Sequence, residues 1–213
     1  MLMPFQAIPV PTKLITPEDD LLEVIATYAA PHLRKGDVLV IAESALAISQ
    51  GRIVRPEEVK PGLWARLISQ FIHQDGSLSS PFALQAVMNE EGVLRTVFAF
   101  LVGSLSRILF RRRGDFYRLA GRQAALVDDI TGTIPPFDKY IVLGPREPQK
   151  AVNGIKKRFG VGAAVIDAND LGRTEILAMT PDVSEKLLLD VFRNNPAGNA
   201  DEQTPFVILR KTP

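Results

Sequence analysis

The sequence predicts a mixed α+β (α/β) protein in which helices flank a mixed β-sheet. Apolar runs of strand length alternate along the chain with stretches of helical periodicity, and hydrophobic residues make up 46% of the 213 residues. That content is enough for one large core or two smaller ones. No internal repeat or low-complexity segment interrupts the pattern. We expect a single domain over residues 1–213, with two lobes divided near residues 62–110 as the alternative.

The composition excludes several classes of protein. Lys and Arg number 25 and Asp and Glu 24, so the whole chain is not drawn electrostatically to nucleic acid or acidic membranes. Cysteine is absent, which excludes disulfides, thiol catalysis and cysteine metal sites. The N-terminal segment contains Pro4, Pro9 and Pro11 and no basic region, so it does not resemble a signal peptide. We expect a cytoplasmic protein without a transmembrane segment.

The first quarter of the chain predicts a helix followed by two strands. Residues 16–19 combine a hydroxyl cap, a proline and two acids, which is typical of a helix start. An apolar helical stripe follows over residues 21–29. The apolar run 37–42 predicts a buried strand, and residues 51–54 predict a short second strand.

The middle of the chain predicts two helices and then three strands. Apolar positions over residues 63–72 share one helical face, and Ser80-Pro81 opens a helix that continues through Met88. Strands are predicted at residues 115–119, 124–127 and 140–143.

The last third predicts two helices, each followed by a strand. Residues 147–159 have an amphipathic pattern, with Gly160 placed to end that helix. A strand is expected over residues 161–166. Thr180-Pro181 is interpreted as the start of a helix through Phe192, and residues 206–209 as a final strand.

Oxygen-bearing side chains cluster directly after residues 124–127. Asp128 and Asp129 are followed by Thr131 and Thr133. Strand ends are where α/β proteins place their sites, and such oxygens suit Mg²⁺ or Mn²⁺ carrying a phosphate. The alternative is a simple turn that leaves a strand.

A second polar cluster follows the strand expected at residues 161–166. It contains Asp167, Asn169 and Asp170, with Arg173 after a glycine. A guanidinium there can bind a carboxylate or phosphate through two hydrogen bonds. An Asx-type turn with a solvated arginine remains the alternative.

Residues 97–113 are almost wholly apolar and end in three arginines. The stretch is shorter than the roughly 20 residues that span a bilayer. It is open to two interpretations: a membrane-surface or partner-binding helix, or a buried or subunit-interface helix with a solvated basic end.

Common nucleotide-binding and catalytic motifs are absent from the sequence. There is no GxxxxGKS/T phosphate loop, no GxGxxG after a strand, no GxSxG and no HExxH. A bound nucleotide must therefore be held by a less common arrangement, and no catalytic residue is assigned.

Several blocks together resemble the coenzyme F420-0:γ-glutamyl ligase family over roughly residues 5–175. Residues 36–42 with 51–54 are similar to the family's "GDVLVVAQKIVSKAEGRVV", at identical spacing. Residues 17–25 resemble "GDDLAEII", and residues 125–128 resemble the metal motif "AGVD". Residues 145–148 resemble the start of "PEDPDESA", and residues 165–173 resemble "IISDTFGR".

The resemblance implies a fold, an activity and a set of ligands. Members join the amine of L-glutamate to a carboxylate of a deazaflavin precursor, using GTP and Mg²⁺ or Mn²⁺, and they are homodimers. The resemblance implies that Asp128 is a metal ligand, and the two acidic clusters add Asp129 and Asp170 as expected ligands. Arg52 and Arg173 match the family's blocks and are expected to bind substrate or nucleotide, together with the hydroxyl of Thr131.

The sequence also departs from that family. Ser44 and Ile48 stand where the family motif has lysines, and Asn169 stands where it has an aspartate. We therefore weigh two classes of function, a nucleotide- and metal-dependent γ-glutamyl ligase and a diverged, non-catalytic ligand- or partner-binding protein. Peripheral membrane contact through residues 97–113 is a third and weaker interpretation.

Overall fold

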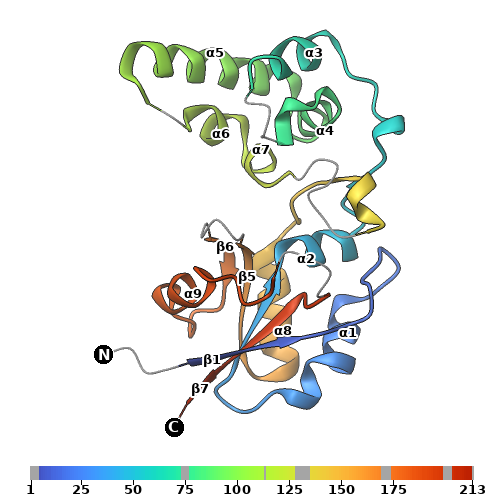
Figure 1. Cartoon of the computed structure of the whole chain (residues 1–213), viewed down its shortest axis with the longest axis vertical. Coiled ribbons are helices and arrows are strands. Elements are labelled where there is room, and N and C mark those ends of the chain that lie inside the picture. The colour runs from blue at the N-terminus through green and yellow to red at the C-terminus, as the bar shows by residue number, and fades with distance from the viewer. Residues whose placement is uncertain are drawn as a thin grey trace. The chain divides into compact units, whose positions relative to one another are not determined.

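The computed structural model describes residues 5–72, 77–112, 114–127, 135–168, 174–198 and 203–212. The chain forms two compact units, of which the first combines Met1–Gly51 with Pro145–Pro213. The second unit is Arg52–Gly144. Figure 1 shows strands β1, β2 and β5–β7 in the first unit and helices α3–α7 in the second.

The first unit is built on a five-stranded sheet, and its mixed strand directions agree with the fold class that the sequence predicts. The strand order is β1-β7-β2-β5-β6, and β2 and β5 form its parallel pair. The strands are β1 (Phe5–Val10), β2 (Val38–Ala42), β5 (Gly162–Ala168), β6 (Thr174–Met179) and β7 (Phe206–Lys211). The continuous apolar runs of β2 and β5 are explained by this central, doubly covered position.

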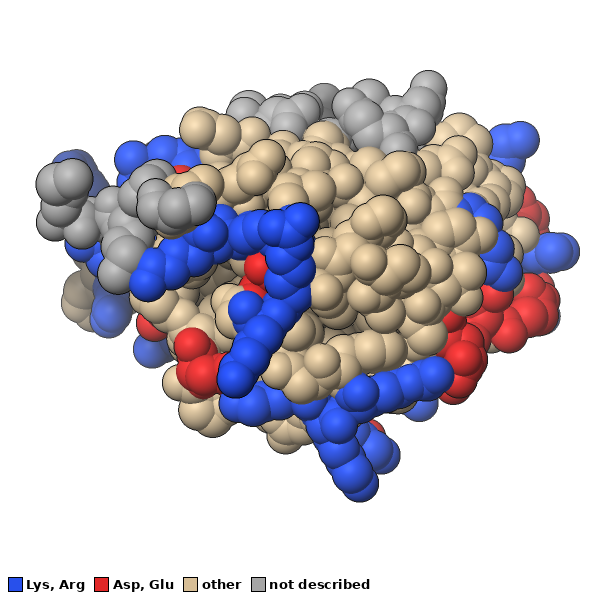
Figure 2. All heavy atoms as spheres, turned by 90° about the horizontal axis from the view of Figure 1, so that it is seen from below, with Lys and Arg blue, Asp and Glu red and all other residues tan. Residues whose placement is uncertain are grey.

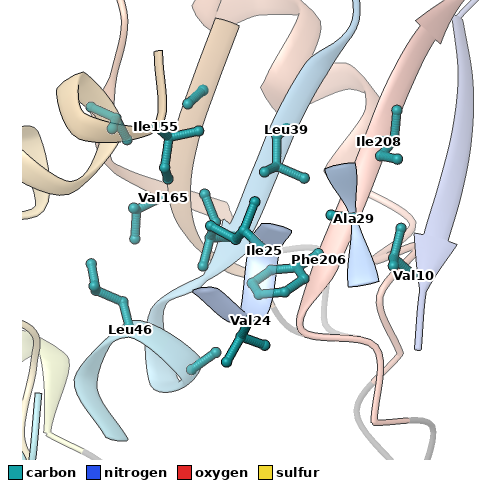
Figure 3. Close-up of a cluster of buried hydrophobic side chains, with 14 of the residues drawn as sticks. Val10, Val24, Ile25, Ala29, Leu39, Leu46, Ile155, Val165, Phe206 and Ile208 are labelled. Carbon is teal, nitrogen blue, oxygen red and sulfur yellow. The ribbon is translucent and has the colours of Figure 1, made fainter. Parts of the chain in front are cut away.

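Helices cover both faces of this sheet. They are α1 (Leu21–Tyr28), α2 (Glu43–Ser49), α8 (Pro148–Phe159) and α9 (Glu185–Phe192). On one face, Ile25 of α1 and Ile155 of α8 belong to one core cluster with Leu39, Val165 and Phe206 (Figure 3). Alternate strand residues point to the other face because side chains in a strand have a period of two.

On that other face, α9 supplies the cover. Leu188 and Phe192 are fully or almost fully buried and share a cluster with Val40, Ile166 and Val207. The sheet is thus a middle layer between α9 and the group α1, α2 and α8.

A buried ion pair joins the start of β2 to the end of β7. The Asp37 side chain is 3% exposed and accepts hydrogen bonds from Arg210 Nη2 at 2.7 Å and Arg210 Nε at 3.1 Å. The backbone N–H of Arg34 donates to the same carboxylate at 2.8 Å. Such a two-pronged pair fixes the geometry of both partners.

The second unit is mainly helical. Its helices are α3 (Leu63–Ser69), α4 (Pro81–Glu91), α5 (Val93–Phe110), α6 (Asp115–Ala120) and α7 (Arg122–Leu126). A small antiparallel sheet pairs β3 (Ile53–Val54) with β4 (Ile141–Val142). Leu84, Val87 and Met88 of α4 lie at the centre of the core.

Two predicted strands of this unit are wrong. Residues 115–119 and 124–127 lie in or directly after helices α6 and α7. Phe116, Leu119 and Ala120 are spaced at i, i+3 and i+4 and pack into the helical core. A short apolar run fits either structure, and here packing against neighbouring helices selects the helix.

Two predicted helix starts are also displaced. The first helix begins at Leu21, after Asp20, whose carboxylate accepts from the N–H of Leu22 and Glu23. The last begins at Glu185, after Ser184, whose hydroxyl accepts from the N–H of Leu187. In both cases a later capping residue starts the helix, because the cap must satisfy the first backbone N–H groups.

Two helical glycines are expected to respond oppositely to alanine. A Cβ on Gly103 of α5 would lie 2.9 Å from the backbone N of Phe116, so α5 and α6 would have to separate. A Cβ on Gly154 of α8 meets only Leu22 Cδ1 at 4.0 Å. Gly103→Ala should therefore lower the free energy of unfolding by about 1–3 kcal/mol, and Gly154→Ala should raise it by about 0.5–1 kcal/mol. Urea denaturation of both variants measures this, and stabilisation by Gly103→Ala would contradict the close helix packing.

Candidate functional site

Acidic side chains lie at the carboxyl edge of the parallel strands in the first unit. β2 and β5 pair in register up to Ala42 and Ile166, so Glu43 and Asp167 follow at the same edge. Glu43 is buried in the first turn of α2. Asp167 lies opposite Glu175 of β6. This edge is where the sequence predicted a site.

The carboxyl group of Asp167 is in an unfavourable setting for its charge. Desolvation by its surroundings raises the pKa of Asp167 above its usual value, and the negative charge of Glu175 raises it further. The side chain still reaches solvent, which moderates both effects. A divalent cation would offset the repulsion between the neighbouring carboxylates of Asp167 and Glu175, and carboxylate oxygens are the ligands that such cations prefer.

The described residues do not complete a metal site by themselves. Within them, no group of three or more His, Cys, Asp or Glu side chains is arranged to hold a metal ion. Asp170 and Arg173, which the sequence singled out beside Asp167, lie outside the described residues. The pair Asp167 and Glu175 therefore fits a metal ion only as part of a larger ligand set.

Asp128, Asp129 and Thr131 also lie outside the described residues. The chain leading to them is a helix, α7, followed by Val127 in an extended conformation. The expectation that these acids follow a strand is therefore wrong.

Arg52 is the one predicted binding residue that the structure describes, and it is buried. Its side chain is 6% exposed, and its Nη1 lies 3.1 Å from Oε1 of Glu90. Its Nε donates to the carbonyl of Gly144 at 3.1 Å, and its own carbonyl accepts from the N–H of Leu143 at 2.8 Å. The strand pair β3–β4 and helix α4 thus fix this guanidinium in place.

One nitrogen of Arg52 lacks a partner. Nη2 is buried and has no hydrogen bond within the described part of the chain. Buried donors are nearly always bonded, because leaving one unmade costs about 1–3 kcal/mol. An unpaired guanidinium N–H in a buried, rigidly held arginine is a suitable donor to an anionic ligand.

Gln123 of α7 bonds to the same carbonyl group as Arg52. Its Nε2 donates to the same Gly144 carbonyl at 3.3 Å, and its backbone N–H donates to Oε1 of Glu91 at 3.0 Å. Its Oε1 is buried and, among the described residues, unbonded. Arg52 and Gln123 thus both donate to the carbonyl of Gly144. Among the described residues, each also keeps one unbonded group, the donor Nη2 of Arg52 and the acceptor Oε1 of Gln123.

The two positions that lack the family's lysines differ in environment. Ile48 of α2 is 5% exposed and forms part of the hydrophobic interior. Ser44 is partly exposed on the same helix. Neither side chain can supply a positive charge.

Glu43, Glu90 and Gln123 were not predicted from the sequence. Glu43 was missed because α2 follows β2 without a break, so no turn signal marks the start of this helix. Gln123 stands beside a run that was predicted as a strand. Glu90 is recognisable only through its contact with Arg52, which is 38 positions earlier in the chain.

A surface pocket of about 410 Å³ lies at the other end of the parallel strands. Its lining residues are Ala30, Leu33, Arg34, Lys35, Phe159, Gly160 and Val161. These residues precede β2 and β5, so the pocket is at the amino edge of the pair and is separate from Asp167.

The charged side chains form no single block on the face shown in Figure 2. Lys and Arg lie around and across a largely uncharged area, and Asp and Glu lie among them at its borders. This distribution agrees with the near balance of 25 basic and 24 acidic residues.

The described residues form a mixed α+β fold, and its helical unit holds a buried arginine, Arg52, with one nitrogen that has no partner among them. The sequence profile of the F420-0:gamma-glutamyl ligase family matches residues 9–166. The chain belongs to this family. The expected mixed-sheet fold and the resemblance seen in the sequence are both confirmed.

Two characterised relatives carry the same activity in their names. A coenzyme F420:L-glutamate ligase of Methanopyrus kandleri is 27% identical over 171 residues, which cover 78% of this chain and 59% of that protein. A coenzyme F420:L-glutamate ligase of Archaeoglobus fulgidus is 30% identical over 125 residues, covering 59% of this chain and 45% of that protein. The chain spans about half the length of these relatives.

Proposed function

We propose that this protein is a ligase that joins L-glutamate, through its amine, to a carboxylate of a deazaflavin coenzyme F420 precursor or a related acid. The family match over residues 9–166 carries the proposal. GTP and Mg²⁺ or Mn²⁺ are the co-substrate and the metal ion that we expect, and the cytoplasm is the compartment. Among the described residues, the buried and incompletely bonded Arg52 supports a site for an anionic group.

The reaction needs an activated carboxylate. A free carboxylate is a poor acyl donor, so transfer of a phosphoryl group from the nucleotide must first supply a leaving group. The protein then has to hold several negative charges and position the attacking amine. Arg52 would donate Nη2–H to one of the anionic groups, and Arg173 and Thr131 would bind others.

A divalent metal ion would neutralise charge on the transferring phosphoryl group. Asp128, Asp129 and Asp170 are the ligands that we propose. Hard carboxylate oxygens are the ligands that Mg²⁺ and Mn²⁺ favour.

A second candidate function is ligand or partner binding without ligation. The observation that favours it is the loss of positive charge along α2. Ile48 is packed into the interior and Ser44 is neutral, so this helix cannot offset the charge of a triphosphate. For the same reason we expect a ligase of this chain to be slow toward the family's own substrate.

Asp128→Asn should weaken binding of Mn²⁺ by more than tenfold. The substitution removes a full ligand charge while keeping the shape of the side chain. Isothermal titration calorimetry with Mn²⁺, with and without GTP, measures the effect. Asp190→Asn on the exposed side of α9 is the matched control and should bind as the original protein does. If the original protein binds neither Mn²⁺ nor Mg²⁺, the proposed metal site is wrong.

A thermal-shift experiment separates the two functional classes at the level of ligands. GTP and ATP are each tested with Mg²⁺, with Mn²⁺ and without metal. A ligand that binds the folded state raises the midpoint temperature of unfolding by mass action. The ligase proposal predicts a shift that needs nucleotide and metal together. A nucleotide-independent response, or none, favours a binding protein that has lost the reaction.

A further inference from the structure

The second unit exposes many large apolar side chains on and beside α3 and α5, and we call this set the apolar face. Its side chains are between 44% and 86% exposed. They are Leu63, Trp64 and Leu67 of α3, Phe71 directly after it, and Leu94, Phe98, Leu101, Leu105, Ile108, Leu109 and Phe110 of α5. This side of α5 is not buried within the chain, whereas the interpretation of residues 97–113 as a subunit-interface segment stays a prediction. Patches of this kind mark interaction sites.

The spacing along α5 places these side chains in one line. Leu94, Phe98, Leu101, Leu105 and Ile108 occur at intervals of four and three residues, so they share one helical face over the whole helix. The opposite side is packed. Its buried residues are Thr96, Ala99 and Gly103, and Gly103 lies directly against Phe116 of α6.

Helix α3 extends the apolar face beside α5. The rings of Phe71, at the end of α3, and Phe100 of α5 lie 5.9 Å apart, which joins the two helices. Figure 1 shows α3 and α5 next to each other within this unit.

The same segment has a strong positive charge. Residues 93–122 contain seven arginines and one aspartate, a formal net charge of +6, whereas the whole chain carries +1; Arg95 among them is paired with Glu91, just before this range. Arg111 and Arg112 are exposed directly after the last turn of α5. Helix α5 itself contains two arginines and no acidic residue.

We propose that the apolar face docks on the surface of an anionic lipid bilayer, with α5 lying along the membrane plane. Exposed apolar side chains on one side of a helix, bordered by arginines, combine burial in the headgroup region with attraction to anionic lipids. Trp64 of α3, which is 47% exposed, is a residue type that favours the membrane interface.

A second copy of the chain fits this face less well. Pairing two copies through it would bring two segments of charge +6 together, and like charges so placed repel. The homodimer expected from the family resemblance stays a prediction, and a dimer through the apolar face is an outcome of the experiment below.

A lengthwise orientation agrees better with the packing of α5 than insertion across the bilayer. Among the described residues, α5 is the one helix long and apolar enough to cross a membrane by length and composition. Its 18 residues are slightly short of the roughly 20 that a span requires. Crossing would also strip α6 from Gly103 and place Arg107 in the hydrocarbon.

Vesicle flotation tests the proposal with the full chain. The protein should float with vesicles of phosphatidylcholine and phosphatidylglycerol, and much less with phosphatidylcholine alone. Binding should weaken in high salt, because exposed charges are screened. Absence of binding to the anionic vesicles would overturn the proposal.

Two variants separate the apolar and the charged contributions. The double variant Leu101→Gln, Ile108→Gln should reduce the partition coefficient between water and vesicles by roughly tenfold or more. Arg111→Gln with Arg112→Gln should reduce it roughly fivefold for each arginine, and only on anionic vesicles. Leu189→Gln on α9 and Lys150→Gln on α8 are exposed controls in the first unit and should bind as the original protein does.

Light scattering without lipid completes the experiment. The proposal predicts that Leu101→Gln with Ile108→Gln leaves the mass in solution unchanged. A dimer that this variant dissociates, together with unchanged lipid binding, would assign the apolar face to a second copy and overturn the membrane proposal.

Discussion

Replacing Asp37 with alanine is expected to lower the free energy of unfolding by about 3 kcal/mol. The Asp37 carboxylate is 3% exposed and is the partner of Arg210 and of the backbone N–H of Arg34. Its removal takes the carboxylate away from the guanidinium of Arg210, which keeps only the carbonyl of His32, and from the backbone N–H of Arg34. This loss lies at the lower end of the destabilisation caused by breaking a buried ion pair, because the Arg210 side chain is still 18% exposed.

Urea denaturation followed by circular dichroism measures this loss. Asp190→Ala, on the exposed side of α9, is the control and should change stability by less than about 0.5 kcal/mol. If Asp37→Ala proves as stable as the original protein, the ion pair does not join β2 to β7 as described.

Replacing Arg52 with lysine should lower the affinity for GTP by roughly tenfold to a hundredfold. This factor corresponds to the free energy of one hydrogen bond to a charged group. Lysine keeps the charge but cannot reproduce the planar fork that bonds Glu90 and Gly144 and leaves Nη2 available. Titration calorimetry with GTP and Mn²⁺, performed well below the unfolding temperature, measures the change.

Arg55→Lys is the matched control for that measurement. Arg55 stands three positions later, is exposed, and lies over the ring of Tyr140 with its Cζ 5.8 Å from the ring centroid. It should keep the original affinity. Equal losses in both variants would indicate a general effect of charge or stability, and the assignment of Arg52 to the ligand would then be wrong.

Much of the fold could be predicted because its central elements have strong local patterns. Strands β2 and β5 are continuous apolar runs bounded by glycine or polar residues, and α8 has a clear amphipathic period. The short strands β3 and β4 and the final strand β7 were also predicted. Each of these elements is recognisable from fewer than fifteen residues.

The elements that were missed depend on distant partners. β1 contains Pro9 and forms the edge of the sheet only by pairing with β7, nearly 200 residues later. β6 is a second edge, paired with β5 after a bulge between Val165 and Ile166. Helix α2 follows β2 immediately, so no turn signal separates the two.

The site could be predicted only in part for the same reason. Arg52 was found because its spacing from the strand at residues 38–42 matches a family block. Its surroundings could not be found, since Glu90, Gln123 and Gly144 approach it only in the folded second unit. The carboxylates at Asp128, Asp129 and Asp170 lie outside the described residues, and their role rests on the family resemblance.

The most direct test of the proposed ligase is product formation from its expected substrates. The protein is incubated with the deazaflavin precursor, L-glutamate, GTP and Mn²⁺, and the glutamylated product is followed by mass spectrometry. The account predicts product that depends on GTP and metal, formed more slowly than roughly 1 s⁻¹, the lower end of typical enzyme rates. The slow rate follows from the missing positive charges at Ser44 and Ile48. No product after long incubation with active nucleotide and metal would contradict the ligase proposal, and turnover above that rate would contradict the role given to those two positions.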